Sequence, residues 1–154
     1  MSRLLLAIFA GICLLTMRPA LMTAQDGSYD ENALRLEDHF GVQIVRGASD
    51  VVVGKIGMFR GIDVSAVVKS SPNAVAEAKI FQHDYTPGML MASLGIVTLG
   101  AAIGASRIAG INQMIPTGIT IVSVGLLSYG GSKLQNAYKA LSKSIWWYNR
   151  DLKK

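Results

Sequence analysis

Two apolar stretches fill most of the chain between residues 88 and 132. Residues 89–106 and 114–132 contain no charged side chain, and the short connection between them carries one charge, Arg107. At about 1.5 Å per residue each stretch would form a helix about 27 Å long, near the lower limit for a bilayer core. The pattern predicts a transmembrane helical hairpin. The alternative is a buried hairpin in a soluble protein, but the remaining chain is too small to cover both helices.

Small residues recur along this hairpin and predict close helix packing. Gly100 and Gly104 are spaced four residues apart, as are Ala101 and Ala105, and such pairs let helix backbones approach closely in lipid. The simpler interpretation is that the two helices of one chain pack together through these residues. The alternative is assembly of several copies, including a pore, although neither helix contains a charged or amide side chain to line an ion path.

Residues 133–154 predict a basic amphipathic helix. Lys139, Lys143 and Arg150 lie on one face of a helical wheel, nearly opposite an apolar stripe. The stripe consists of Leu134, Tyr138, Leu141, Ile145, Tyr148 and Leu152. A helix of this kind can lie on an anionic bilayer with its stripe in the lipid.

Trp146 and Trp147 project away from the apolar stripe, one on each side of the cationic face. Burial of the stripe in lipid would leave both in water, which favours a protein partner that grips the tail. The alternatives are an interfacial anchor with aromatic rings at headgroup depth and a coiled-coil contact. The candidate residues for membrane or partner docking are Leu134, Tyr138, Leu141, Lys143, Ile145, Trp146, Trp147, Tyr148 and Arg150.

Residues 1–24 have the pattern of an export signal. Arg3 precedes the apolar residues 4–17, and the segment that ends at Ala24 resembles a cleavage region. We expect cleavage after Ala24, and the alternative is an uncleaved anchor. Cleavage would remove Cys13, the single cysteine, and with it any disulfide or thiol chemistry.

Residues 25–87 predict a small soluble α+β domain. Helix formers within residues 30–40, followed by Gly41, predict a helix. The β-rich segments GVQIV and VVVGKIGMF are separated by a turn-type cluster at residues 46–50, which predicts a β-hairpin.

Two further helix starts follow the predicted β-hairpin. Asp63 is placed to cap a short helix, and Ser71 precedes Pro72, a proline in the first turn where its missing N–H costs nothing. After Pro72 an apolar face is predicted, formed by Val75, Ala78, Phe81 and Tyr85.

Composition and charge agree with a membrane location. The chain is 51% hydrophobic and 16% charged, against about 25% charged in typical soluble domains. The net charge of +5 resides in the tail, because residues 133–154 carry six bases and one acid whereas residues 25–87 carry nine acids and six bases. A basic charge confined to one tail indicates an anionic lipid or protein surface and no nucleic acid.

Patterns for catalysis, cofactor binding or metal binding are missing from the sequence. His83 and Asp84 are adjacent, but Glu77 lies seven residues before Asp84, which is poor spacing for a metal site. Residues 125–133 resemble a phosphate-binding loop only superficially, and Gly130-Gly131 is better interpreted as a flexible joint between hairpin and tail. We therefore expect no enzyme, no cofactor and no metal.

The order of these parts resembles a recurring group of uncharacterised bacterial envelope proteins. The resemblance rests on the signal, VVVGKIGMFRG, DVSAVVKSSPNAVAEAKIFQ, the Gly-rich apolar hairpin and a tail that ends ALSKSIWWYN. It implies a compartment and an architecture, and it brings no known activity.

The expected protein is a mainly α membrane protein with a small α+β segment. Its predicted parts are a signal peptide (1–24), a periplasmic α+β domain (25–87), a transmembrane helical hairpin (88–132) and a basic amphipathic helix (133–154). Export followed by two crossings would place domain and tail on the outer side of a bacterial inner membrane, although the positive-inside tendency would place the tail in the cytoplasm.

The expected function is non-enzymatic. We expect an interaction or scaffolding subunit that associates with the lipid bilayer and with a protein partner or with further copies of itself. The alternative is a homo-oligomeric pore-forming or membrane-remodelling protein.

Overall fold

A computed structural model describes residues 31–38, 41–57, 62–108 and 110–153. The predicted signal segment, with its single cysteine, lies outside the described residues. The elements are β1 (Leu34–Asp38), β2 (Val42–Arg46), β3 (Val51–Lys55), α2 (Val64–Val67), α3 (Pro72–Ala105) and α4 (Met114–Asp151). The described chain is thus mainly helical, with two long apolar helices and one antiparallel sheet in the order β1-β2-β3.

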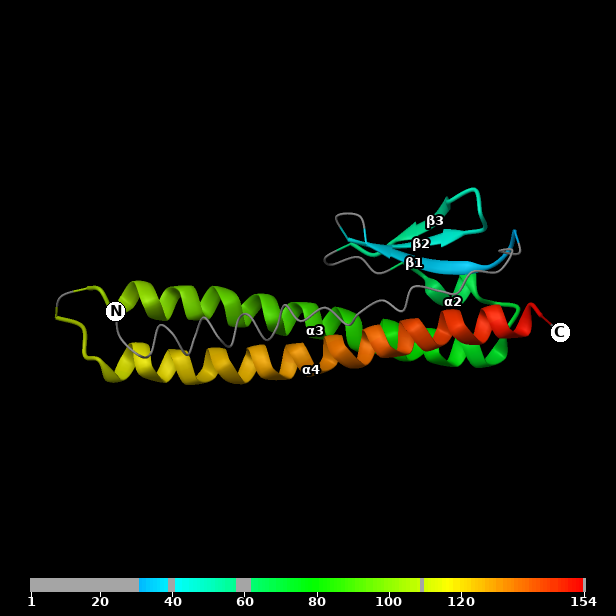
Figure 1. Cartoon of the computed structure of the whole chain (residues 1–154). Helices are drawn as coiled ribbons and strands as arrows, with labels where there is room; N and C mark the ends of the chain where they lie inside the picture. Colours follow the sequence, from blue (N-terminus) through cyan, green and yellow to red (C-terminus); the bar gives the residue numbers. More distant parts are fainter. Residues whose placement is uncertain (1–30, 39–40, 58–61, 109, 154) are drawn as a thin grey trace.

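Helices α3 and α4 run side by side as one long hairpin (Figure 1). We call residues 89–106 and 114–132 the tip half, because they adjoin the connecting loop. Residues 72–88 and 133–151 form the base half. The sheet and α2 lie over one side of the base half, and the tip half extends beyond them (Figure 1).

The predicted β-hairpin is confirmed by β2 and β3, which pair in antiparallel fashion with a bulge between Ile44 and Val45. Gly47 and Asp50 adopt positive φ values of 69° and 55° in the turn between the strands, conformations that glycine and aspartate tolerate better than most residues. The turn-type cluster therefore predicted this connection for the right physical reason.

The helix expected within residues 30–40 is wrong, because residues 34–38 form strand β1. Leu34 and Leu36 alternate there with Arg35 and Glu37, which is the period of a strand. Leu34 is buried, while Arg35 Nε lies 2.9 Å from Glu37 Oε1 on the other face. Pairing with β2 decides against the helix propensity of these residues.

The predicted cap at Asp63 and the predicted helix start at Ser71-Pro72 are confirmed. The Asp63 carboxylate accepts a hydrogen bond from the Ala66 N–H at 3.2 Å at the start of α2. The Ser71 hydroxyl accepts from the Ala74 N–H at 3.3 Å at the start of α3, with Pro72 in the first helical turn.

The two long helices continue across the expected boundaries between residues 87 and 88 and between residues 132 and 133. Helix α3 runs through Pro87, and α4 runs through Gly130 and Gly131 into the basic tail. The expected joint is instead a contact, because a Cβ at Gly130 would lie 2.5 Å from the Ala92 amide nitrogen of α3. The tail is therefore the last part of α4 and not a separate helix.

Close approach of α3 and α4 depends on different small residues from those predicted. A Cβ at Gly88 or Gly95 would lie 3.1 Å or less from atoms of Leu134 or Leu127 on α4. Gly100 and Gly104 are exposed, and a methyl group on either would meet no described atom within 4 Å. Ala101 is also exposed, and Ala105 is half-buried. The prediction that these pairs pack the two helices of one chain is wrong, because the two pairs lie largely outside the interface.

The core lies between the sheet and the base half. Phe81 and Tyr85 of the predicted α3 face are buried there with Ala78, and Val75 is half-buried against them. The Tyr85 hydroxyl donates to the Gly57 carbonyl at 2.8 Å, which connects α3 to the segment after β3.

Asn149 attaches the sheet to α4. Its Oδ1 accepts from the Leu34 N–H at 2.8 Å, and its Nδ2 donates to the Leu34 carbonyl at 2.7 Å. The side chain thus pairs the N–H and the carbonyl of Leu34 at the edge of β1 as a neighbouring strand would. The basic tail and the sheet therefore belong to the same packed unit.

The glycine contact predicts a matched pair of substitutions. Gly130→Ala should destabilise the protein by about 1–3 kcal/mol, because the new methyl meets the α3 backbone. Gly125→Ala, in the same helix but in open space, should be neutral or stabilise by up to about 1 kcal/mol. Thermal unfolding in mild detergent, followed by circular dichroism, measures both. Equal effects of the two substitutions would contradict the packing.

Candidate functional site

The tip half exposes a belt of large apolar side chains. Its members on α3 are Leu90, Leu94, Ile96, Val97 and Ile103, and those on α4 are Met114, Ile115, Ile121, Val122, Val124 and Tyr129. The most apolar 18-residue stretch of α3 is 22% buried inside the structure, and that of α4 is 17% buried. A core helix of a soluble protein is mostly buried. Both helices are thus long and apolar enough to cross a membrane, and most of this surface is uncovered by described residues.

The interior of the tip half is polar at one level. The buried Ser123 hydroxyl donates to the Thr98 hydroxyl across the two helices at 2.8 Å and lies 2.7 Å from the Ile119 carbonyl. Thr98 in turn lies 2.8 Å from the Leu94 carbonyl. Hydroxyls bonded in this way add a specific interhelical contact without a charge in the apolar region.

An ion pair lies at the junction of the two halves. Lys133 Nζ on α4 is 2.7 Å from Asp84 Oδ1 on α3, and His83 Nδ1 is 2.8 Å from the same oxygen. Asp84 is 7% exposed and His83 is exposed. The hydrogen bonds from Lys133 and His83 lower the pKa of Asp84 below its ordinary value. Between this level and Arg107 near the loop, neither helix carries a charged residue.

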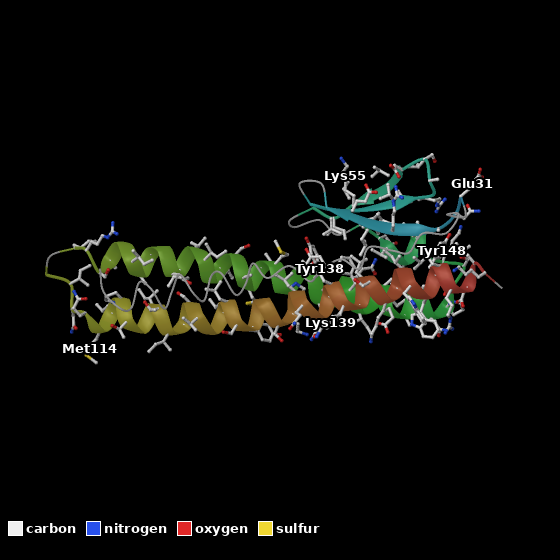
Figure 2. All side chains as sticks on the ribbon, in the orientation of Figure 1. Glu31, Lys55, Met114, Tyr138, Lys139 and Tyr148 are labelled. Carbon is white, nitrogen blue, oxygen red and sulfur yellow. The ribbon has the colours of Figure 1, made fainter. Side chains whose placement is uncertain are left out.

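The apolar stripe of the tail packs against other parts of the same chain. Leu141, Ile145 and Tyr148 are buried in the core, and Leu134 and Tyr138 pack against it. Figure 2 shows Tyr138 and Tyr148 on the side of α4 that faces the sheet. The amphipathic pattern is therefore real, but α3 and the sheet cover the stripe that was expected to face lipid. A tail lying on a bilayer through this stripe is not what the structure shows.

The opposite side of the tail is open, and we call it the tryptophan face: Lys139, Lys143, Trp146, Trp147 and Arg150. Trp146 is 56% exposed, whereas Trp147 is half-buried and packs against the core. The Arg150 guanidinium carbon lies 3.7 Å from the Trp147 ring centroid and 5.1 Å from that of Trp146. Figure 2 shows Lys139 on the side of α4 away from the sheet.

Several polar contacts that organise this region were not predicted. The Ser144 hydroxyl donates to the Ala74 carbonyl at 2.8 Å, and the Ser71 hydroxyl donates to Asp151 Oδ2 at 2.6 Å. With Asn149, these contacts join both helices and the sheet. Ser144 has a signal in the sequence, because it is a small polar residue beside the apolar stripe, whereas the signal at Ser71 indicated only a helix start.

A metal site is not formed by the described residues, since no three of their His, Cys, Asp or Glu side chains gather. His83 and Asp84 contact each other and Lys133, while Glu77 is 3.9 Å from Lys143. The described arrangement therefore offers surfaces for binding, one apolar and one cationic.

Comparison with protein-family models, curated proteins and solved structures finds no match.

The ion pair predicts a pH-dependent contribution to stability. Asp84→Asn should lower the melting temperature at pH 7 by about 2–5 °C, because Lys133 loses its partner. Since the pKa of Asp84 is lowered in the folded protein, its contribution is complete above the ordinary value of 3.8 and is lost as pH falls through the lowered value. The difference between the wild type and Asp84→Asn should therefore shrink at pH 2.

The matched control is Glu77→Gln, whose carboxylate lies 3.9 Å from the exposed Lys143. This substitution should leave the melting temperature nearly unchanged, because a pair 3.9 Å apart with an exposed lysine contributes little. A pH-independent effect of Asp84→Asn would show that the ion pair is not its cause.

Proposed function

We propose that the protein is a non-enzymatic, membrane-anchored envelope protein that acts as an interaction or scaffolding subunit. The tip half crosses the bilayer as a helical hairpin. The base half and the sheet stand outside the membrane as one packed unit. The observation that carries this proposal is the exposed apolar belt, which ends at the Asp84–Lys133 ion pair.

The dimensions of the tip half support a membrane crossing. Residues 114–132 of α4 extend over about 28 Å, close to the hydrocarbon thickness of about 30 Å. Tyr129 is 53% exposed one turn before Lys133, the position of an interfacial aromatic. Leucine, isoleucine and valine each favour insertion by about 0.3–0.6 kcal/mol, so one helix gains only a few kcal/mol.

The contact between the sheet and the tail supports a location of both on the same side of the membrane. Asn149 of the tail is bonded to β1, so the two cannot lie on opposite sides of a bilayer. The export pattern of residues 1–24 favours the periplasmic side of a bacterial inner membrane for this unit.

A homo-oligomeric pore-forming or membrane-remodelling protein is the second candidate function. It is favoured by Gly100 and Gly104, which are exposed on α3 and leave room for a helix of another copy. The mass of the detergent-solubilised protein distinguishes the two functions. A monomer or a defined hetero-complex supports the scaffold, and a defined homo-oligomer supports the second candidate.

Membrane crossing predicts that charge in the belt prevents insertion. Val97→Lys with Val122→Lys should move most of the protein out of the alkali-resistant membrane fraction. Each lysine at a helix centre costs about 2.5–3.5 kcal/mol, which offsets the few kcal/mol that its own helix gains on insertion. Both valines are exposed, so the change leaves the core intact.

The matched control places two lysines on exposed positions of the base half. Ile80→Lys with Gln135→Lys should leave the protein in the membrane fraction, because neither position contacts lipid in the proposed arrangement. A wild-type protein that is released by alkali, or equal behaviour of the two double variants, would contradict the proposal.

A further inference from the structure

The tryptophan face joins cationic and aromatic groups on one exposed surface. Lys143 is 66% exposed at its side chain and Arg150 is 42% exposed. Two acids lie against these cations. Glu77 Oε1 of α3 is 3.9 Å from Lys143 Nζ, and Asp151 Oδ1 is 3.8 Å from Arg150 Nε, while Asp151 Oδ2 accepts a hydrogen bond from Ser71. The three cations Lys139, Lys143 and Arg150 exceed these two acids, so the surface is net positive, with the exposed indole of Trp146 beside the cations.

Under the proposed membrane crossing, this surface stands away from the lipid. Trp146 follows Lys133 by 13 residues, which is about 20 Å along an α-helix. A helix tilt of about 40° would still leave it about 15 Å above the level of Lys133, and the headgroup layer is about 5–8 Å thick. The continuity of α4 through Gly130 and Gly131 prevents the tail from folding down onto the bilayer.

The apolar stripe gives a second, independent reason against a lipid surface. An interfacial helix binds by placing its apolar face in the acyl region. In α4 that face is buried against α3 and the sheet, with Leu141 fully buried. The open face offers charges and a single exposed indole, which suits a partner that supplies anionic groups above the membrane.

We propose that the tryptophan face docks an acidic segment of a protein partner at a height that lipid headgroups do not reach. Carboxylates of the partner would pair with Lys139, Lys143 and Arg150, while its apolar side chains cover the exposed ring of Trp146. Tryptophan and arginine are enriched among the residues that dominate protein interfaces. This inference rests on the proposed function, because the height follows from the membrane crossing.

The two tryptophans provide a direct readout, because the whole chain contains only these two. We would incorporate the full chain into phosphatidylcholine nanodiscs and record tryptophan fluorescence. Acrylamide in the water should quench it, and a lipid with a nitroxide on its headgroup should not. Strong quenching by that lipid would show an interfacial anchor and would overturn the inference.

The binding probe is poly-L-glutamate of about 20 residues, with poly-L-lysine as the reference. Poly-L-glutamate at low salt should reduce quenching by acrylamide, and poly-L-lysine should not. The double variant Lys139→Glu with Lys143→Glu should weaken this binding at least tenfold. Arg150 and its stacking on the indoles are retained in this variant. Added salt should weaken the binding as well.

The matched control is Lys55→Glu with Lys69→Glu, which changes the net charge equally at exposed positions outside the tryptophan face. Figure 2 shows Lys55 on the sheet, on the other side of the molecule from Lys139. This control should change the affinity less than twofold. Failure of poly-L-glutamate to bind, equal losses in the two variants, or tighter binding to phosphatidylglycerol nanodiscs through Lys139 and Lys143 would overturn the inference.

The inference and the proposed function fail in different ways. A chain that enters nanodiscs but does not bind the probe contradicts only the docking site. A chain that does not enter nanodiscs contradicts the membrane crossing, and the inference then falls with it.

Discussion

Glycines hold α3 and α4 at a separation that larger residues would not permit. Gly130 lies against the α3 backbone at Ala92, and Gly88 and Gly95 receive leucines from α4. The contact continues along both halves of the hairpin, so it fixes the direction of the tail relative to the tip. Because the tail cannot swing at Gly130, its apolar stripe faces α3 and the sheet, and its cationic side faces outward. The position of every surface considered for function follows from this packing.

One hairpin therefore combines two patterns of burial. In the base half, large side chains such as Phe81 and Leu141 are fully buried beneath the sheet, as in a soluble domain. In the tip half the two helices bury mainly small groups between them and turn their large side chains outward, as in a lipid-facing bundle. The Asp84–Lys133 pair lies where one pattern changes into the other. Its charges are tolerable there because they pair across the interface, close to the water-exposed His83.

Local features of this fold could be predicted from the sequence, whereas the partners of each surface could not. The β-hairpin and the caps at Asp63 and Ser71 depend on neighbouring residues, so short patterns suffice. Strand β1 was missed because its alternation is only five residues long and its pairing partner decides the structure. The stripe of the tail was expected to face lipid, and α3 and the sheet cover it instead, because periodicity identifies an apolar face but does not say what covers it. The role of a glycine is ambiguous in the sequence for the same reason. Gly130 lies in contact with α3, whereas a methyl group on Gly100 would meet no described atom within 4 Å.

A spin-label scan along the outer side of α4 in lipid bilayers tests this account most directly. Labels at residues 118, 122, 125, 136, 143 and 150 would be compared for collisions with oxygen, which partitions into lipid, and with a water-soluble nickel complex. We expect oxygen to dominate at the first three positions and nickel at the last three. Lipid-like accessibility at residues 143 and 150 would contradict the continuous hairpin that carries its tail away from the membrane.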